Sequence, residues 1–237
     1  MSTLAPYPTP MTDLSSWTSR PTPGLATLSG ERVRLEPLDW ERHGPGLFAA
    51  VGGEANAGIW TWMPVGPFPT PESLGSFLAG AAKTEGWKTL VILDQATGEM
   101  LPQEVLGTAS YMRIREAHGS AEIGCVALGP KLRRTPQATE AFALMARSLF
   151  LDLGYRRYEW KCHRENEASN RSALRFGFTF EGIFRNDMVM KGRSRDTAWY
   201  SITDEDWPKL DKALTGWLAA SNFAPDGRQL RTLEDFR

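Results

Sequence analysis

The sequence predicts an α+β domain with a central mixed, mostly antiparallel sheet of about seven strands flanked by helices. Strands are indicated by alternation of apolar and polar residues, most clearly at Tyr158, Trp160 and Cys162, which have charged residues between them. The predicted order is β-α-α-β-β-β-α-β-α-β-β-α. Several antiparallel strands come first and one β-α-β crossover follows, which is typical of a mixed sheet rather than a doubly wound one.

Composition and charge exclude several classes of function. The 237 residues carry 27 Lys and Arg against 28 Asp and Glu, which argues against a nucleic-acid partner because such partners select a basic face. No apolar stretch reaches about 18 residues, so no membrane span is expected. The two cysteines, the lack of a secretion signal and the absence of metal-ligand spacing predict a cytoplasmic protein without a metal site.

Residues 1–27 differ in composition from the rest of the chain. They hold five prolines among Ser and Thr, which predicts an extended arm or, alternatively, a strap packed on the domain through Tyr7 and Trp17. We expect the domain itself at 28–221 and a C-terminal tail at 222–237.

The first half of the domain combines short strands with capped helices. Asp39 is placed to cap one helix, and Thr70 followed by Pro71 starts another. Between them, 56–69 is rich in aromatic residues, Gly and Pro and is expected to be an ordered loop. The expected elements are strand 31–38, helix 39–51, helix 70–85, strand 87–93, loop 94–104, strand 105–115 and strand 120–128.

The second half is predicted around one long amphipathic helix at 136–153. Its apolar stripe is formed by Ala138, Phe142, Met145, Leu149 and Leu153. The expected later elements are strand 157–163, helix 166–176, strands 178–190 and 195–203 joined by the turn MKGRS, and helix 205–220.

The loop before the helix at 136–153 has the properties of an anion site. It carries Arg133 and Arg134, and Pro136 starts the helix. The first N–H groups of a helix lack intrahelical partners, and the helix dipole favours negative charge. The residues alone therefore indicate a phosphate-bearing ligand, with a merely well-capped helix as the alternative.

Four stretches in this order resemble the GCN5-related N-acetyltransferase (GNAT) superfamily, in particular its RimJ/RimL-like branch. They lie within residues 28–210 and read IWTWMPVGPFPT (59–70), AEIGCVAL (121–128), RRTPQATEA (133–141) and NEASNRSALRFGFTFEG (166–182). RDTAWYSI (195–202) also fits the last strand of the branch. The resemblance implies a GNAT-like fold that transfers an acetyl group from acetyl-CoA, its co-substrate, to an amine without a metal. It also implies a sheet splayed between its fourth and fifth strands, 120–128 and 157–163, where the pantetheine arm lies.

By this resemblance, coenzyme A is held by the basic loop and by the edge of the fourth strand. The superfamily motif Q/R-x-x-G-x-G/A here reads Arg133-Arg134-Thr135-Pro136-Gln137-Ala138. Proline has no N–H, so one donor to the pyrophosphate is lost and weaker CoA binding is expected. Four donors are expected to remain, at Arg134, Thr135, Gln137 and Ala138. The backbone of Val126 and Leu128 is expected to bond the pantetheine like an added strand.

Acyl transfer needs a base for the attacking amine, a donor for the oxyanion and a proton for the leaving thiolate. Glu122 lies on the fourth strand, on a face with Gly124 and Val126 in the predicted alternation. We expect it to act as the base, through a water, or to bind the amine. A surface glutamate paired with an arginine is the alternative.

The candidate acid comes from the helix at 166–176. Asn166 and Ser169 match the N-x-x-S of the branch, in which the Asn contacts pantetheine and the Ser hydroxyl lies near the sulfur. Asn166 is equally well placed as a helix N-cap. The tyrosine that many superfamily members use as the acid corresponds to Ala173, so Ser169 or a water is expected to take this role.

Aromatic residues are predicted around the acceptor, where they would exclude water and hold a cation or an apolar side chain. The candidates are Trp60, Trp62, Met63, Phe68 and Trp199. Core packing is the alternative for each of them. Arg185 and Asp187 are expected either to contact the substrate or to form a surface pair. His163 and Glu165 either face the site or belong to a solvated loop.

The predicted acceptor is a primary amine, on a small molecule or at a protein N-terminus. One alternative is a succinyl-CoA or other acyl-CoA transferase, whose distal carboxylate would require arginines that the sequence does not place. Another is a non-catalytic CoA-binding or sensing domain, which Pro136 and Ala173 favour and Glu122 disfavours. A homodimer remains open.

Overall fold

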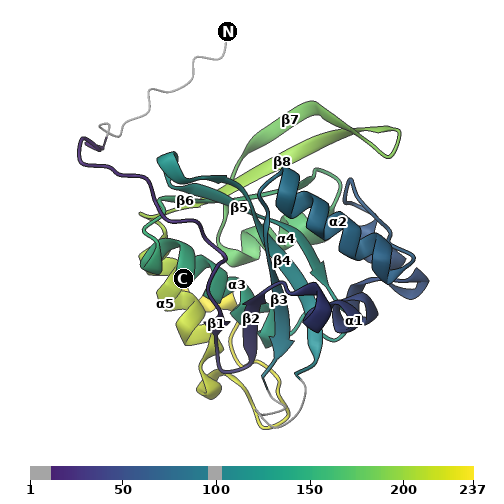
Figure 1. Cartoon of the computed structure of the whole chain (residues 1–237). Coiled ribbons are helices and arrows are strands. Elements are labelled where there is room, and N and C mark those ends of the chain that lie inside the picture. Colours follow the sequence, from purple (N-terminus) through teal and green to yellow (C-terminus); the bar gives the residue numbers. More distant parts are fainter. Residues whose placement is uncertain (1–11, 96–102) are drawn as a thin grey trace.

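Eight strands form one sheet in the computed structural model, which describes residues 12–95 and 103–237 (Figure 1). The strand order is β1-β2-β3-β4-β5-β6-β8-β7, and every neighbouring pair is antiparallel except β5 and β6. The α+β prediction is confirmed, and the eighth strand is β1, whose two residues are too few to show alternation. The strands are β1 Leu28–Ser29, β2 Val33–Pro37, β3 Lys88–Asp94, β4 Val105–Arg115, β5 Ser120–Leu128, β6 Arg157–His163, β7 Thr179–Met190 and β8 Arg193–Thr203.

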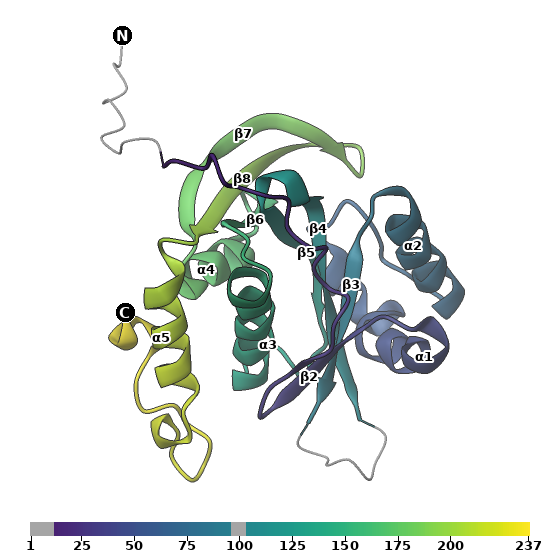
Figure 2. The same cartoon turned by 60° about the vertical axis from the view of Figure 1, so that its left-hand side comes forward.

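Helices cover both faces of the sheet, with α1 and α2 on one side and α3, α4 and α5 on the other (Figures 1 and 2). The helices are α1 Trp40–Val51, α2 Pro71–Thr84, α3 Pro136–Arg147, α4 Glu167–Phe176 and α5 Trp207–Leu218. Shorter helical turns are η1 Glu54–Trp60, η2 Glu116–His118, η3 Ser148–Asp152, η4 Ala220–Asn222 and η5 Leu233–Phe236. No helix in the described ranges combines the length and apolarity that a bilayer crossing requires.

Local capping explains where the helices start. The Asp39 carboxylate accepts from the backbone of α1, Thr70 and Ser73 form a capping box at α2, and Thr135 caps α3. All three starts agree with the sequence prediction. The helix ends also agree to within two residues except at α3, which stops at Arg147 and continues as the π-helical turn η3. The loop predicted at 56–69 contains most of η1.

The β7–β8 hairpin extends beyond the body of the sheet (Figure 2). Its turn consists of Lys191 and Gly192, both left-handed with φ of 50° and 77°, the backbone that a tight two-residue turn requires. Strand β8 therefore starts at Arg193, two residues before the predicted start. Lys191 Nζ donates to the Trp60 carbonyl at 2.7 Å, which holds the hairpin tip against η1.

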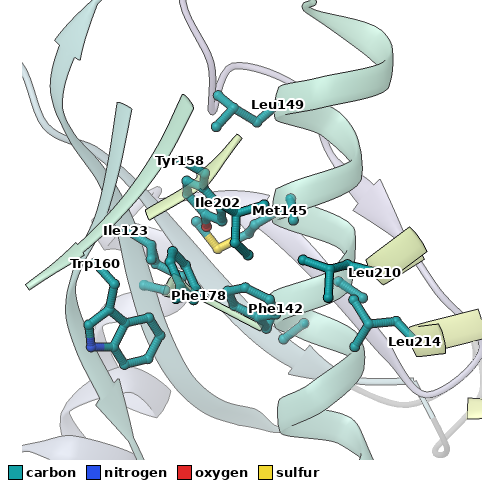
Figure 3. Packing of buried hydrophobic residues seen from close by; sticks show 14 of the residues in the cluster. Ile123, Phe142, Met145, Leu149, Tyr158, Trp160, Phe178, Ile202, Leu210 and Leu214 are labelled. Atoms are coloured by element: carbon teal, nitrogen blue, oxygen red, sulfur yellow. The ribbon is translucent and has the colours of Figure 1, made fainter. Parts of the chain in front are cut away.

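The larger of two hydrophobic clusters fills the space between the sheet, α3 and α5 (Figure 3). Phe142 of α3 stacks on Phe176 of α4 with ring centroids 4.2 Å apart and packs on Tyr158 of β6. Buried Glu140 of α3 accepts from the Val33 backbone at 2.9 Å, which ties the helix to β2. The start of α3 is therefore held rigidly over the sheet.

Both terminal segments lie on the domain where they are described. Trp17 Nε1 donates to the Ala117 carbonyl at 2.9 Å and the Tyr155 hydroxyl to the Pro21 carbonyl at 3.0 Å, contacts of the kind expected for a strap. Tyr7, the other residue of that prediction, lies outside the described residues. In the C-terminal segment, Leu233 is buried and Phe223 packs edge-on against Trp217 of α5.

Candidate active site

Strands β5 and β6 separate halfway along their length. Their parallel pairing covers Ser120–Ile123 of β5 and Arg157–Trp160 of β6, and none of the later residues of the two strands pair with each other. The predicted splay is confirmed. It leaves the backbone of Gly124 to Leu128 unpaired with β6, although the Leu128 carbonyl accepts from the Arg133 side chain.

A β-bulge at Cys125 changes which residues of β5 share a face. Thr108 pairs with Ala127 and Ser110 with Gly124, so two residues of β5 oppose one residue of β4, and Cys125 has φ of 46°. Simple alternation put Glu122 and Val126 on one face, and that prediction is wrong. Val126 lies on the α3 side of the sheet, whereas Glu122 and Gly124 lie on the other side.

A cleft of about 540 Å³ lies on the α3 side of the splay. Five of the residues that were predicted to bind coenzyme A line it, namely Val126, Leu128, Arg134, Thr135 and Ala138. The other predicted residues do not: Arg133 turns back so that its Nε donates to the Leu128 carbonyl at 2.9 Å, and Gln137, Asn166 and Ser169 lie outside the cleft lining.

The start of α3 presents backbone donors toward this cleft. The Ala138 N–H, expected to be free, donates to Thr135 Oγ1 at 3.3 Å, so the N-cap already uses it. Within the described part of the chain, no hydrogen bond engages the N–H groups of Arg134, Thr135 and Gln137. Arg134 has φ of 62°, a left-handed residue of the kind that helps form concave backbone anion sites.

The sequence analysis missed residues from α4 and from the tail. Arg175 lines the cleft, donates from Nη1 to Thr139 Oγ1 at 3.1 Å and lies 4.9 Å from the Trp217 ring, and no described carboxylate pairs with it. Its pKa is lowered, chiefly by burial. Phe223 and Gln229 of the tail complete the wall. Arg175 belongs to a stretch that carries the family resemblance, but no pattern in the tail marks its residues as part of a site.

Glu122 lies on the opposite side of the sheet, on the last paired stretch before the splay. Its side chain is 2 % exposed, so the alternative of a surface glutamate is wrong. Lys161 Nζ lies 3.3 Å and Arg113 Nε 3.5 Å from Oε2, which forms no hydrogen bond in the described structure. Burial raises the pKa of Glu122 to about 7, and the attraction of Lys161 and Arg113 limits the rise.

Two more groups share this face with Glu122. Glu159, directly beside it on β6, is buried and accepts from Arg157 Nε at 2.8 Å and from Arg115. Trp199 of β8 lies under Arg113 and Lys161, with cation-to-ring distances of 5.0 and 5.4 Å. Of the predicted acceptor residues, Trp199 is therefore the one in contact with the partners of Glu122.

Ser169 lies in the first turn of α4, outside the cleft lining. Its backbone N–H donates to Asn166 Oδ1 at 3.2 Å, so Asn166 is the N-cap of α4. Trp160 Nε1 donates to Ser169 Oγ at 3.0 Å, and the Ser169 side chain also forms a hydrogen bond with the Cys162 thiol. Ala173 is fully buried beneath this turn and offers no polar group.

The aromatic residues predicted around the acceptor fall into two groups. Trp60 and Phe68 are core residues, since Trp60 is 1 % exposed, its Nε1 donates to the Val51 carbonyl and its ring meets Phe68 at 4.8 Å. We therefore withdraw these two as acceptor contacts. Trp62 is exposed and lies 4.9 Å from the His163 ring, and Met63 next to it is half-buried.

Arg185 and Asp187 are exposed on the edge strand β7 and form no ion pair with each other among the described contacts. Together with Asn186 they oppose the single residue Asp196 of β8, so β7 bulges there. The structure does not bring Arg185 to the cluster around Glu122.

Comparison with known proteins agrees with this geometry. The family described as "Acetyltransferase (GNAT) domain" matches residues 32–179. A GCN5-related N-acetyltransferase from Brucella melitensis is 44 % identical, with a TM-score of 0.87 over 94 % of this chain and 99 % of that one. A probable acetyltransferase of the GNAT family from Chromobacterium violaceum ATCC 12472 is 38 % identical, with a TM-score of 0.76 over 88 % and 100 % of the two chains.

A curated relative is similar over a shorter segment. The uncharacterized N-acetyltransferase YoaA of Bacillus subtilis (strain 168) is 35 % identical over 100 residues, which is 42 % of this chain and 56 % of that protein. The match thus spans little more than half the length of the relative. Together with the splayed strands and the cleft at the start of α3, the matches show that this chain belongs to the GNAT family of acetyltransferases.

Proposed function

We propose that this protein is an acyl-CoA-dependent N-acyltransferase of the RimJ/RimL-like branch, which transfers an acetyl group from acetyl-CoA to a primary amine in a ternary complex. The observation that carries the proposal is the placement of Glu122. It is a buried carboxyl group with a pKa of about 7, at the point where the two strands part and on the side of the sheet opposite the cleft. A group with this pKa can accept a proton near neutral pH.

The donor binds in the cleft on the α3 side. Free N–H groups at Arg134, Thr135 and Gln137, together with the guanidinium groups of Arg134 and Arg175, suit a pyrophosphate and a further phosphate. The pantetheine arm then follows the free edge of β5 at Val126 and Leu128. Pro136 withholds one donor but starts the helix in the correct backbone conformation.

The reaction proceeds by direct attack. Glu122, through a water, takes a proton from the ammonium group of the acceptor, and the free amine attacks the thioester carbon. A C–N bond forms and the C–S bond breaks. The nitrogen then loses its second proton to solvent, which leaves a neutral amide. Ser169 gives its proton to the departing thiolate and recovers one from solvent, and Trp160 Nε1 holds the serine oxygen in place.

The acceptor binds on the Glu122 side, between Trp199 and the segment that carries Trp62. Lys161 and Arg113 lie over Trp199, and their positive charges lower the pKa of Glu122. Their charge also disfavours binding of a bare polycation beside Glu122.

The test is release of CoA thiol from acetyl-CoA, measured with a panel of primary amines at pH 8, together with thermal stability of the purified protein. Acetyl-CoA at about 100 times its dissociation constant is expected to stabilise the protein by about 2.7 kcal/mol. At least one amine is expected to be acetylated. Stabilisation by CoA without acylation of any amine would instead favour a sensing domain, the function suggested by Pro136 and Ala173.

A further inference from the structure

Arg195 of β8 is a buried cation without a carboxylate partner. The residue is 5 % exposed, its Nε donates to Thr197 Oγ1 at 3.1 Å, and its Nη1 lies 3.8 Å from Met190 Sδ. Both partners are neutral, and no ion pair within 4.0 Å reaches the guanidinium from the described residues. Buried arginine is uncommon in proteins unless it is paired, because burial removes its hydration.

The nearby buried carboxylates are already neutralised by other cations. Glu122 has Lys161 and Arg113, and Glu159 has Arg157 and Arg115. Asp187 and Glu122 do attract Arg195 from a distance, but burial outweighs them and lowers the pKa of the guanidinium. Cations therefore outnumber carboxylates on this side of the sheet, and Arg195 is the cation that no described carboxylate pairs with.

The guanidinium still has capacity to bind. Its Nη2 forms no hydrogen bond to the described residues, and it is not among the polar atoms that are sealed from solvent without a partner. It therefore opens onto accessible space with free N–H donors. A planar, bidentate donor of this kind matches a carboxylate.

The position of Arg195 connects it to the proposed acceptor site. Its bond to Thr197 places it on the side of β8 that Trp199 also faces. Thr197 is paired with His163, whose ring Trp62 covers, and Trp199 is paired with Lys161, the partner of Glu122. Trp199 lies four positions after Arg195, about 13 Å along the strand, a span that a small substrate and the long arginine side chain can bridge.

We propose that Arg195 binds a carboxylate group of the substrate, so that the compound acylated, or the acyl group transferred, carries a carboxylate in addition to the reacting centre. The inference rests on the proposed function and narrows its substrate class. The carboxylate has two possible sources: an amino-acid-like acceptor, or the distal end of a dicarboxylic acyl group such as succinyl.

Binding is tested first, without turnover. The CoA-loaded protein is titrated with succinate or with succinamide at constant ionic strength while thermal stability is followed. Succinate is expected to stabilise the wild type and the Arg193→Met control, which changes an exposed arginine on the same strand. Arg195→Met is expected to weaken the succinate response by about tenfold or more, and Arg195→Lys by less, since it keeps the charge. An equal response of the wild type and Arg195→Met, or no response to succinate in the wild type, overturns the inference.

The melting temperature of Arg195→Met without ligand gives a second readout. If the arginine serves a ligand, replacing it by an apolar side chain should leave the melting temperature without ligand unchanged or raise it. A lower melting temperature in Arg195→Met than in Arg193→Met would contradict the inference, because it would make Arg195 a structural residue.

Turnover then separates the two sources. In the first experiment the donor is acetyl-CoA, and an amino acid is compared with its amide as acceptor. In the second the acceptor is an amine that has no carboxylate, and succinyl-CoA is compared with acetyl-CoA as donor. Preference for the acid in the first pair assigns the carboxylate to the acceptor, and preference for succinyl-CoA in the second assigns it to the acyl group. Either preference should vanish in Arg195→Met. Acylation of amines with no preference in either pair would contradict the inference and leave the proposed function intact. Succinate binding without acylation of any amine would support carboxylate binding at Arg195 and contradict the proposed function.

Discussion

The two faces of strand β5 differ in how they would serve the reaction. On the α3 side, Ile123, Val126 and Leu128 form an apolar wall along a cleft that ends at the backbone donors of α3. On the other side, Glu122 is buried among arginine and lysine side chains. The first face suits the binding of a long co-substrate by shape and backbone hydrogen bonds. The second suits chemistry, since burial, opposed by the nearby cations Lys161 and Arg113, brings the pKa of Glu122 to about 7.

Small residues and the bulge make this division possible. A Cβ atom at Gly124 would lie 2.3 Å from Met112 Sδ and 2.9 Å from Glu122 Oε1, so a side chain there would displace the Met112 or Glu122 side chain. One residue later, the bulge at Cys125 turns Val126 to the cleft. One strand, β5, can thus bind a co-substrate on one face and place a group for proton transfer on the other.

The largest effect is expected from removing the negative charge on the Glu122 side of the sheet. Glu122→Gln is expected to lower kcat/KM by about 100-fold or more while thermal stabilisation by CoA is unchanged, because the cleft lies on the other face. Glu41→Gln, at an exposed position of α1, is the control. Loss of CoA stabilisation in Glu122→Gln would show that the two faces are not independent.

The pH profile of the wild type extends this test. Glu122 must be ionised to accept a proton, so kcat/KM is expected to rise with pH through a pKa of about 7, and this rise should be absent in Glu122→Gln. A wild-type profile that falls through pH 7 would assign the base to another group.

The next largest effect is expected on the first face. Ala138→Glu places a negative charge in the first turn of α3, where it favours the helix but repels phosphate. CoA binding should weaken by roughly tenfold or more, whereas the neutral Ala138→Gln should bind nearly as well as the wild type. Isothermal titration with CoA measures both variants, and equal weakening in the two would point to steric blocking instead of charge.

A smaller effect is expected at Ser169 of α4. Ser169→Ala removes the candidate acid but leaves water able to replace it, so kcat should fall by about tenfold with little change in KM for acetyl-CoA. The control variant is Ser172→Ala, which changes a serine three residues further along α4 in the cleft lining. A donor with a more acidic leaving thiol should recover much of the lost rate in Ser169→Ala, and no recovery would argue against proton donation.

The smallest effect concerns the donor that Pro136 withholds. Pro136→Gly restores an N–H at the start of α3 and is expected to tighten CoA binding by about threefold. The same change should lower the free energy of unfolding by about 0.5 to 1 kcal/mol because glycine gives the unfolded chain more freedom. Titration calorimetry and chemical denaturation measure the two effects, and unchanged CoA affinity would mean that the phosphates do not reach this position.

Local rules account for the parts of the fold that the sequence predicted well. Asp39 and Thr70 cap the helices that they were expected to cap, because an N-cap bond depends only on residues two or three positions further along the chain. Helix α3 starts at Pro136 as predicted, and its cap, Thr135, was not predicted. The strands of the sheet and the splay between β5 and β6 also agree with expectation. Most helix ends were predicted to within two residues, and the exception is α3, which changes to a π-helical turn at Ser148. The strand β1 was not predicted, because two residues are too few to show alternation.

The candidate site was predictable only in part. The basic loop and Glu122 lie in motifs that can be read directly, but Trp60 and Trp62, two residues apart, differ from nearly complete burial to 38 % exposure. The contribution of the tail to the cleft and the isolation of Arg195 depend on contacts between residues far apart in the chain.

Patterns within short stretches were enough to predict most of the elements, the caps at Asp39 and Thr70, the resemblance to the family and an anion site at the start of α3. The opposite faces of Glu122 and Val126, the burial of Trp60 and the isolation of Arg195 became apparent only in the folded chain. Burial, bulges and electrostatic pairing depend on which strands lie side by side. A residue's pKa and its freedom to bind a ligand follow from what packs against it, which its own segment of sequence does not contain.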